Sequence, residues 1–169
     1  MKVALALRGN LVPVARAESV TKHWNVGWVH GVNPDGLHPR RAIALNGHFP
    51  LQALSVNSND NVAINFTNSF GDGFPPTLHG HGLLYNNTNY YEGAAGIAQC
   101  PVPDGQTFHY EVLNSPQTPA SSEKQVGTYF LHGYYEGQYI DGLRLPFIIH
   151  NADREVYEYD DDYTVALAD

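Results

Sequence analysis

The stretch TLHGHGLLYNN, residues 77–87, places two histidines two positions apart. Alternate side chains of an extended chain point to the same face, so His79 and His81 direct both imidazoles to one side of a strand. Further along, GTYFLHGYYEG (127–137) begins the same pattern with His132 but has Tyr134 at the second histidine position. Glycine follows each of the three histidines, which favours short strands that another backbone or a ligand can approach closely.

The rest of the chain follows the same pattern of short strands between turn residues. Eleven tyrosines, sixteen glycines and eleven prolines favour strands and turns over helices. Segment 114–125 has turn residues without periodicity and is expected to be a loop. The chain is therefore predicted to be all-β, a β-sandwich or Greek-key barrel. The expected strands are residues 23–29, 41–46, 51–56, 61–68, 77–82, 107–113, 127–133, 145–150 and 155–159.

The charge balance excludes two classes of partner. Seventeen acidic and nine basic residues give a net charge of −8, which disfavours binding to nucleic acid or to anionic membrane surfaces. No apolar run is long enough to span a bilayer. Cys100 is the only cysteine, so the chain forms no intrachain disulfide and no thiolate metal cluster.

Residues 1–20 have features of a secretory signal. They contain a basic residue, an apolar run and an Ala-x-Ala ending at Ala17, although polar residues interrupt the apolar run. Two glycosylation triplets, Asn65-Phe-Thr and Asn86-Asn-Thr, also favour export. We expect a degenerate signal followed by a single domain over residues 21–169, in the secretory pathway or, alternatively, in the cytoplasm.

Three of the nine histidines stand out as candidate metal ligands. His79, His81 and His132 lie on two short strand segments, whereas the other six are scattered among aromatic and turn residues. Three neutral imidazoles suit copper or zinc and leave a coordination position open.

Several blocks of the sequence carry a resemblance to a known family. The runs GWVHGVNPDGLHPRRAIALNGHFP (27–50), LHGHGLLYNNTNYYEGAAGIAQCPVPDGQTFHYEV (78–112) and GTYFLHGYYEGQYIDGLRLPFIIH (127–150) agree in order and spacing. Over residues 23 to about 168 the chain resembles the N-terminal cupredoxin domain of multicopper oxidases, among them fungal laccases and ferroxidases. The resemblance implies a cupredoxin-like Greek-key sandwich or barrel.

The resemblance also implies roles for the three histidines. The first domain of the family has an H-x-H-G motif and a later H-x-H motif, which supply half the ligands of a trinuclear copper cluster. By position, His79 resembles a type 2 copper ligand, and His81 and His132 resemble type 3 ligands. Tyr134 stands where the other type 3 histidine belongs, and Gly80 stands where an aromatic residue is usual.

The remaining copper ligands of the family come from a C-terminal domain with an H-C-H motif. This chain ends at Asp169, near where the first domain would end, and Cys100 matches a cysteine that usually forms a structural disulfide. We therefore expect that one copy of the chain does not reduce oxygen by four electrons on its own.

Three functional hypotheses remain open at this stage. In the first, a degenerate multicopper-oxidase-type protein acts on a small aromatic or polyketide-like molecule through a mononuclear copper at His79, His81 and His132, with zinc as the alternative metal. In the second, no metal is bound and Tyr134, His132 and Glu136 catalyse an isomerase, dehydratase or cyclase reaction. In the third, the chain is a non-catalytic accessory subunit. A second copy or a partner chain is expected to cover the histidine face.

Overall fold

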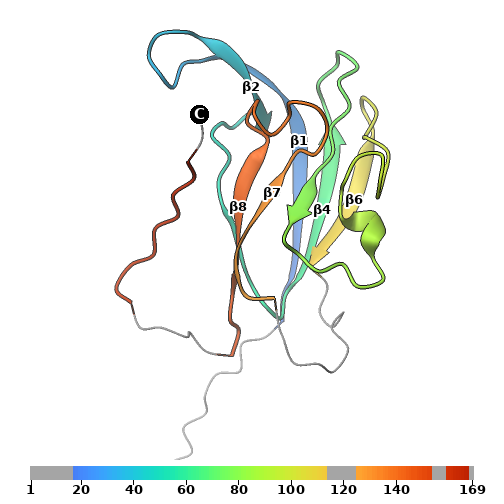
Figure 1. Ribbon diagram of the computed structural model, residues 1–169, viewed down its shortest axis with the longest axis vertical. Helices are drawn as coiled ribbons and strands as arrows, with labels where there is room; N and C mark the ends of the chain where they lie inside the picture. Colours follow the sequence, from blue (N-terminus) through green and yellow to red (C-terminus); the bar gives the residue numbers. More distant parts are fainter. Residues whose placement is uncertain (1–16, 114–124, 154–158, 168–169) are drawn as a thin grey trace, which may run out of the picture.

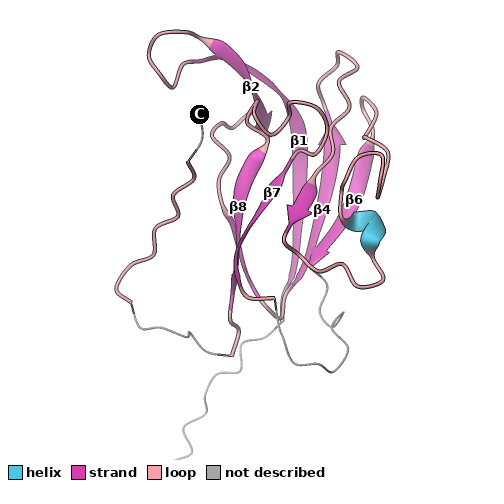
Figure 2. Cartoon of the chain, viewed as in Figure 1, coloured by secondary structure: helices cyan, strands magenta, loops and turns pink. Residues whose placement is uncertain are grey.

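The computed structural model describes residues 17–113, 125–153 and 159–167, which form two facing β-sheets (Figure 1). A single turn of 3₁₀ helix is the only helical element in this part of the chain (Figure 2). In chain order the elements are β1 Ser19–Val32, β2 Arg40–Leu45, β3 Leu54–Asn57, β4 Asn61–Asn68, β5 His79–His81, η1 Asn89–Tyr91, β6 Thr107–Leu113, β7 Gly127–His132 and β8 Arg144–His150. The predicted all-β sandwich is confirmed.

The strands are shared between the sheets in an order that differs from the sequence order. One sheet has the order β2-β1-β4-β6 and the other the order β3-β8-β7-β5; we call them sheet A and sheet B. The pairs β1–β4 and β3–β8 are parallel, and the other neighbours are antiparallel. Crossing between sheets in this way gives the Greek-key connectivity expected from the sequence.

Alternation of apolar and polar residues explains the two-layer arrangement. In β4 the buried side chains include Val62, Ile64 and Phe66, and the residues between them are part-exposed. Strand β8 repeats the pattern from the other sheet, with buried Phe147 and Ile149. Burying one such side chain stabilises the fold by about 1.5–3 kcal/mol, so the shared interior holds the two sheets together.

Some predicted boundaries differ from the observed ones. Strand β1 is longer than predicted, and β3 begins at Leu54 rather than at residue 51. The ladder with β8 starts only at Leu54, which pairs with Phe147. Most of the predicted strand 155–159, the loop 114–125 apart from its last residue, and residues 1–16 lie outside the described residues. Within the described ranges, no helix is long and apolar enough to cross a membrane.

Candidate metal centre

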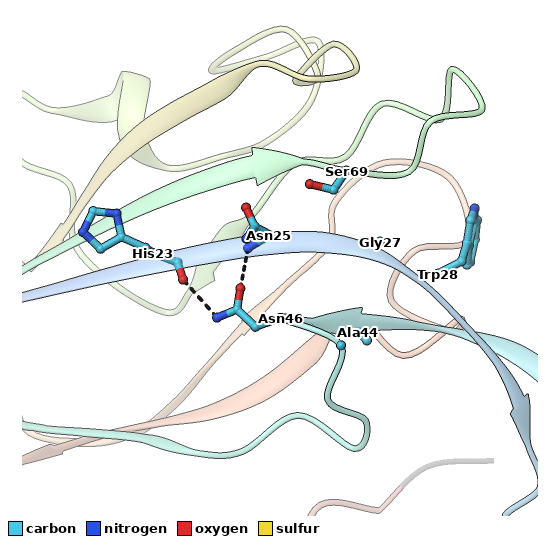
Figure 3. Close-up of a pocket in the computed structure, with 8 residues that line it drawn as sticks. His23, Asn25, Gly27, Trp28, Ala44, Asn46 and Ser69 are labelled. Carbon is cyan, nitrogen blue, oxygen red and sulfur yellow. Dashed lines mark hydrogen bonds between the residues drawn. The ribbon is translucent and has the colours of Figure 1, made fainter.

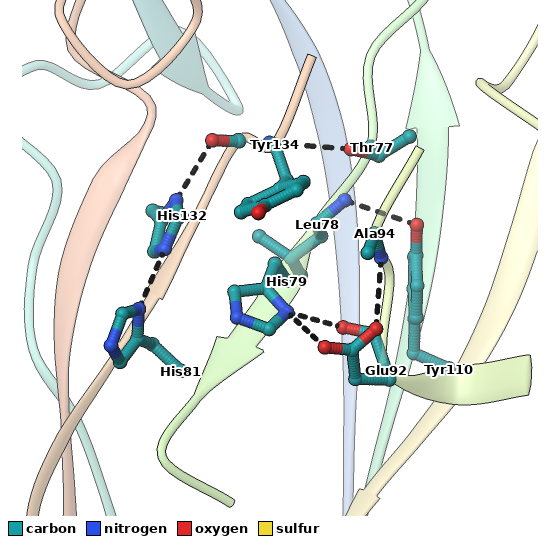
Figure 4. A network of polar contacts seen from close by, with 10 residues as sticks. Thr77, Leu78, His79, His81, Glu92, Ala94, Tyr110, His132 and Tyr134 are labelled. Carbon is teal, nitrogen blue, oxygen red and sulfur yellow. Dashed lines mark hydrogen bonds and ion pairs between the residues drawn. The ribbon is translucent and has the colours of Figure 1, made fainter. Parts of the chain in front are cut away.

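Strands β5 and β7 bring the three candidate ligands together on the outer face of sheet B. His79 pairs with His132 across the two strands, and Gly80 pairs with the buried Leu131. His81 Nδ1 lies 3.2 Å from His132 Nε2, and one ligand nitrogen from each histidine lies within 4.8 Å of the others (Figure 4). Among the described residues this three-histidine centre is the only group of three or more histidine, cysteine or acidic side chains that could hold a metal ion.

Hydrogen bonds fix the orientation of two of the imidazoles. His79 Nδ1 donates to the backbone oxygen of Glu92 at 2.8 Å and lies 3.3 Å from a carboxylate oxygen of the same residue. His132 Nδ1 donates to the backbone oxygen of Gly133 at 2.8 Å. Each bond places the ring proton on Nδ1, so that Nε2 carries the lone pair that a metal would take; hydrogen bonds of this kind orient metal-binding histidines.

The donor set and the distance between His81 and His132 are compatible with a first-row transition metal. Two nitrogens bound tetrahedrally at about 2.0 Å from one metal lie roughly 3.3 Å apart, close to the 3.2 Å between His81 and His132. Burial lowers the pKa of His132, which favours the neutral imidazole that metals require. The His132 imidazole is therefore held in the form that can donate a lone pair to a metal.

A ring from β7 supports the centre from the side. Phe130 stacks on His81 at 4.6 Å between ring centroids and on His132 at 4.8 Å, with an interplanar angle of 22° in each case. Tyr139 contacts the edge of the His132 ring at 5.3 Å. Phe130 was not predicted as part of the centre, although its position two residues before His132 on one strand places both on the same face.

Tyr134 lies beside the imidazoles, where the sequence predicted it. Its ring centroid is 4.9 Å from that of His79 and 5.9 Å from that of His132, and the residue is 47% exposed. Its backbone N–H donates to the hydroxyl of Thr77. The phenol oxygen has no hydrogen-bond partner among the described residues, so it is available to a ligand or to solvent.

The third residue of the predicted catalytic set is less closely associated with the centre. Glu136 is exposed at a positive φ of 50° and, within the described ranges, makes no hydrogen bond, ion pair or ring contact with His132 or Tyr134. The catalytic set Tyr134, His132 and Glu136 stays a prediction, with the first two in ring contact.

The core side of β5 explains why residue 80 is glycine. A Cβ atom at Gly80 would collide with the hydroxyl oxygen of Tyr85 and would lie 2.9 Å from Leu83. Burial, together with the nearby Glu92 carboxylate, raises the pKa of Tyr85, so its phenol stays neutral. The Tyr85 ring therefore fills the space that a side chain at position 80 would need.

Buried polar contacts anchor β5 to the rest of the sandwich. The backbone N–H of Leu78 donates to the Tyr110 hydroxyl at 3.1 Å. The fully buried Gln138 accepts from the Thr77 N–H at 3.3 Å and donates to the Pro75 oxygen at 3.0 Å. These bonds fix the short strand on which two of the three imidazoles are placed.

A Greek-key sandwich of two four-stranded sheets, with three imidazoles converging from neighbouring strands, defines a cupredoxin-type domain with a candidate copper centre. Comparison with known proteins agrees with this class. The family model of multicopper oxidase matches residues 26–154. The chain therefore belongs to the multicopper oxidase family.

Individual relatives support the same assignment. The chain is 50% identical to the iron multicopper oxidase fer1 of Mycosarcoma maydis over 162 residues, which cover 95% of this chain and 26% of that protein. It is 38% identical to the iron transport multicopper oxidase FET3 of Candida albicans, over 94% of this chain and 24% of that protein. The chain thus spans about a quarter of the length of the curated relatives it matches.

Solved structures agree with the fold. The crystal structure of Fet3p, a multicopper oxidase that functions in iron import, matches 84% of this chain and 25% of that chain at 36% identity, with a TM-score of 0.71. The laccase of Botrytis aclada matches 85% of this chain and 24% of that chain at 29% identity, with a TM-score of 0.67. The predicted resemblance to fungal laccases and ferroxidases is confirmed.

Proposed function

We propose that this chain binds copper through His79, His81 and His132 and acts as the cupredoxin unit of a copper oxidoreductase. The observation that carries the proposal is the convergence of three imidazole nitrogens within 4.8 Å from two paired strands. Copper bound there would supply one-electron redox chemistry.

The protein's own groups would hold the ligands and shield one side of them. Glu92 and the Gly133 oxygen orient two imidazoles, and Phe130 stacks against the third. His81 is exposed, so the centre remains open on that side. Tyr134 lies next to this opening, and its phenol is the oxygen we propose as a fourth ligand of a mononuclear copper.

The surroundings favour a small aromatic or polyketide-like substrate. Phe130, Tyr134 and Tyr139 surround the imidazoles with aromatic faces and edges, onto which a planar molecule can stack. Ferrous iron is the second candidate substrate, because two relatives carry iron in their names and the Fet3p structure is described as functioning in iron import.

Two further proposals concern the exposed face of the centre. A second copy of this chain, a partner chain or a further part of a longer protein would cover the exposed His81 and Tyr134 and could add ligands.

We also propose passage through the secretory pathway, from the features of residues 1–20. A metal-free reaction using the unpartnered Tyr134 phenol beside His132 is the alternative chemistry.

Metal content tests the proposal directly. The full chain, purified without a histidine tag, is incubated with copper, desalted and measured by plasma mass spectrometry and electron paramagnetic resonance. We expect near-stoichiometric copper with nitrogen hyperfine splitting in the natural chain, and loss of both signals in His79→Ala and His132→Ala. The matched control His109→Ala should bind as the natural chain does.

Two results would redirect the assignment. A folded protein that takes up no copper or zinc would overturn the metal centre and leave the Tyr134 chemistry to be tested with Tyr134→Phe. A copper-loaded protein that oxidises ferrous iron but no phenol would replace the aromatic substrate with iron.

A further inference from the structure

A row of three polar side chains crosses the outer face of sheet A, away from the metal centre. His23 in β1, Asn65 in β4 and His109 in β6 pair across neighbouring strands, and we call them the asparagine ladder. His109 Nδ1 donates to Asn65 Oδ1 at 2.8 Å, and Asn65 Nδ2 lies 3.3 Å from His23 Nδ1. The carboxamide of Asn65 is thus held with its nitrogen directed towards His23.

A groove of about 540 Å³ begins at His23 and runs along β1 and β2 (Figure 3). Its floor contains the small residues Gly27 and Ala44, and polar side chains, among them Asn25 and Ser69, line it. In the described part of the chain, the Asn25 carboxamide and the Ser69 hydroxyl make no hydrogen bond to protein. The groove therefore presents uncharged donors and acceptors to a ligand.

Hydrogen bonds from the Asn46 side chain fix one wall of the groove. Asn46, at a positive φ of 52°, accepts a hydrogen bond from the Asn25 N–H at 2.8 Å and donates to the His23 oxygen at 3.0 Å. Its side chain continues the β1–β2 ladder beyond the last residue of β2, and it keeps one amide hydrogen and one lone pair for a ligand. The groove is consequently preorganised rather than formed on binding.

Asn65 is also the acceptor residue of the triplet Asn65-Phe66-Thr67. Asn65 and Thr67 both lie on the outer face of β4, whereas Phe66 is fully buried between them. An N-linked sugar replaces only one of the two amide hydrogens, so the bonds to His109 and to His23 can both persist. The attachment nitrogen is one strand, about 4.8 Å, from the start of the groove.

We propose that Asn65 carries an N-linked glycan whose first N-acetylglucosamine residues lie in the β1–β2 groove. Sugars are bound by amide and hydroxyl groups, and the groove supplies these beside the indole of Trp28. The inference is independent of the copper centre but rests on the proposed passage through the secretory pathway. Asn86, the other triplet asparagine, is exposed in the turn before η1 and lines no part of the groove.

The first experiment determines occupancy. The full chain is secreted from yeast behind a heterologous signal, so that entry does not depend on residues 1–20, and intact masses are compared before and after enzymatic deglycosylation. Thr67→Val should remove one glycan without altering Asn65, whereas Thr67→Ser, which preserves the triplet, should retain it. If both secreted variants lose the same mass on deglycosylation, the site is overturned. A natural chain that stays in the cytoplasm behind its own N-terminus would overturn only the localisation.

The second experiment tests where the sugars lie. Endoglycosidase digestion of the folded protein should release the Asn65 glycan about tenfold more slowly than the Asn86 glycan, because cleavage requires it to leave the groove. Asn25→Arg places a long side chain in the groove and should remove this difference, and circular dichroism confirms that the variant is folded. Equal release from both sites in the natural chain would overturn the packed arrangement.

Discussion

The three-histidine centre and the asparagine ladder place histidines on the two outer faces of one sandwich, yet only the first brings imidazoles together. In the centre, His79 and His132 belong to strands that pair directly. In the ladder, β4 lies between the two histidine-bearing strands, so their backbones are roughly 10 Å apart. The Asn65 carboxamide occupies the intervening space and bonds to both rings.

The comparison shows that strand adjacency decides what a pair of histidines can do. Direct neighbours present nitrogens close enough to share one metal ion, whereas histidines separated by a strand are joined through a third side chain. The burial of the rings differs too: His79 and His132 are buried, whereas His23 and His109 are exposed. Of the two groups, only the three-histidine centre combines buried rings with closely spaced nitrogens. Four substitutions test this difference.

The largest expected effect is loss of metal binding in His132→Ala. Copper affinity should fall by more than about 100-fold, because losing a ligand costs more than the roughly 10–100-fold typical of an altered supporting group. Titration calorimetry with a competing chelator measures it. The matched change in the ladder, His109→Ala, should leave copper affinity unchanged. An equal loss of copper affinity in that variant would show that the two groups of histidines do not differ in metal binding.

The second largest effect is expected on stability, from a side chain added at Gly80 on the core side of β5. Gly80→Ala should lower the free energy of unfolding by about 1–3 kcal/mol, because the added methyl group meets the Tyr85 hydroxyl and Leu83. In a Tyr85→Phe background the same change should cost about 1 kcal/mol less, as urea unfolding of the four proteins would show. Additive costs would mean that Tyr85 does not exclude a side chain at position 80.

The support of His79 predicts a smaller change in metal affinity. Glu92→Gln keeps the shape and the backbone acceptor but removes the carboxylate charge 3.3 Å from His79 Nδ1. Copper affinity should fall by about tenfold. Glu136→Gln neutralises a nearby exposed acid as a control and should have no effect, and a similar decrease in both variants would assign the loss to net charge alone.

The smallest effect is expected in the ladder. In protein made without glycosylation, Asn65→Ala should lower the free energy of unfolding by about 1 kcal/mol at most, since two exposed hydrogen bonds are lost. Copper affinity should not change. A measurable loss of copper would show that the two outer faces are coupled through the core.

Most strands could be predicted from the sequence, because the alternation of apolar and polar residues is a local property of the chain. Residues 61–68 and 107–113 were predicted with the bounds they have, since apolar side chains alternate there between turn residues. The start of β3 was missed because it is set by pairing with β8, which begins at Leu54 opposite Phe147, and not by the apolar run itself. Which strands pair, and therefore which faces meet, depends on contacts between distant segments that no local pattern specifies.

The candidate site shows the same division between local and non-local information. The shared face of His79 and His81 followed from their spacing, but their pairing with His132 depends on the β5–β7 register. Phe130 could have been found from the two-residue period of β7. The support from Glu92 could not be predicted from spacing, because its contact with His79 arises where the chain after η1 returns against β5.

Gly80 and Tyr85 restrict the order in which this centre can change during evolution. A side chain at position 80 requires space that the Tyr85 ring now occupies, so alanine is costly there and larger residues are blocked while the ring remains. Replacing Tyr85 by a smaller residue first removes the block. Any mutational path from this chain towards an aromatic residue between the two histidines must therefore pass through position 85 before, or together with, position 80.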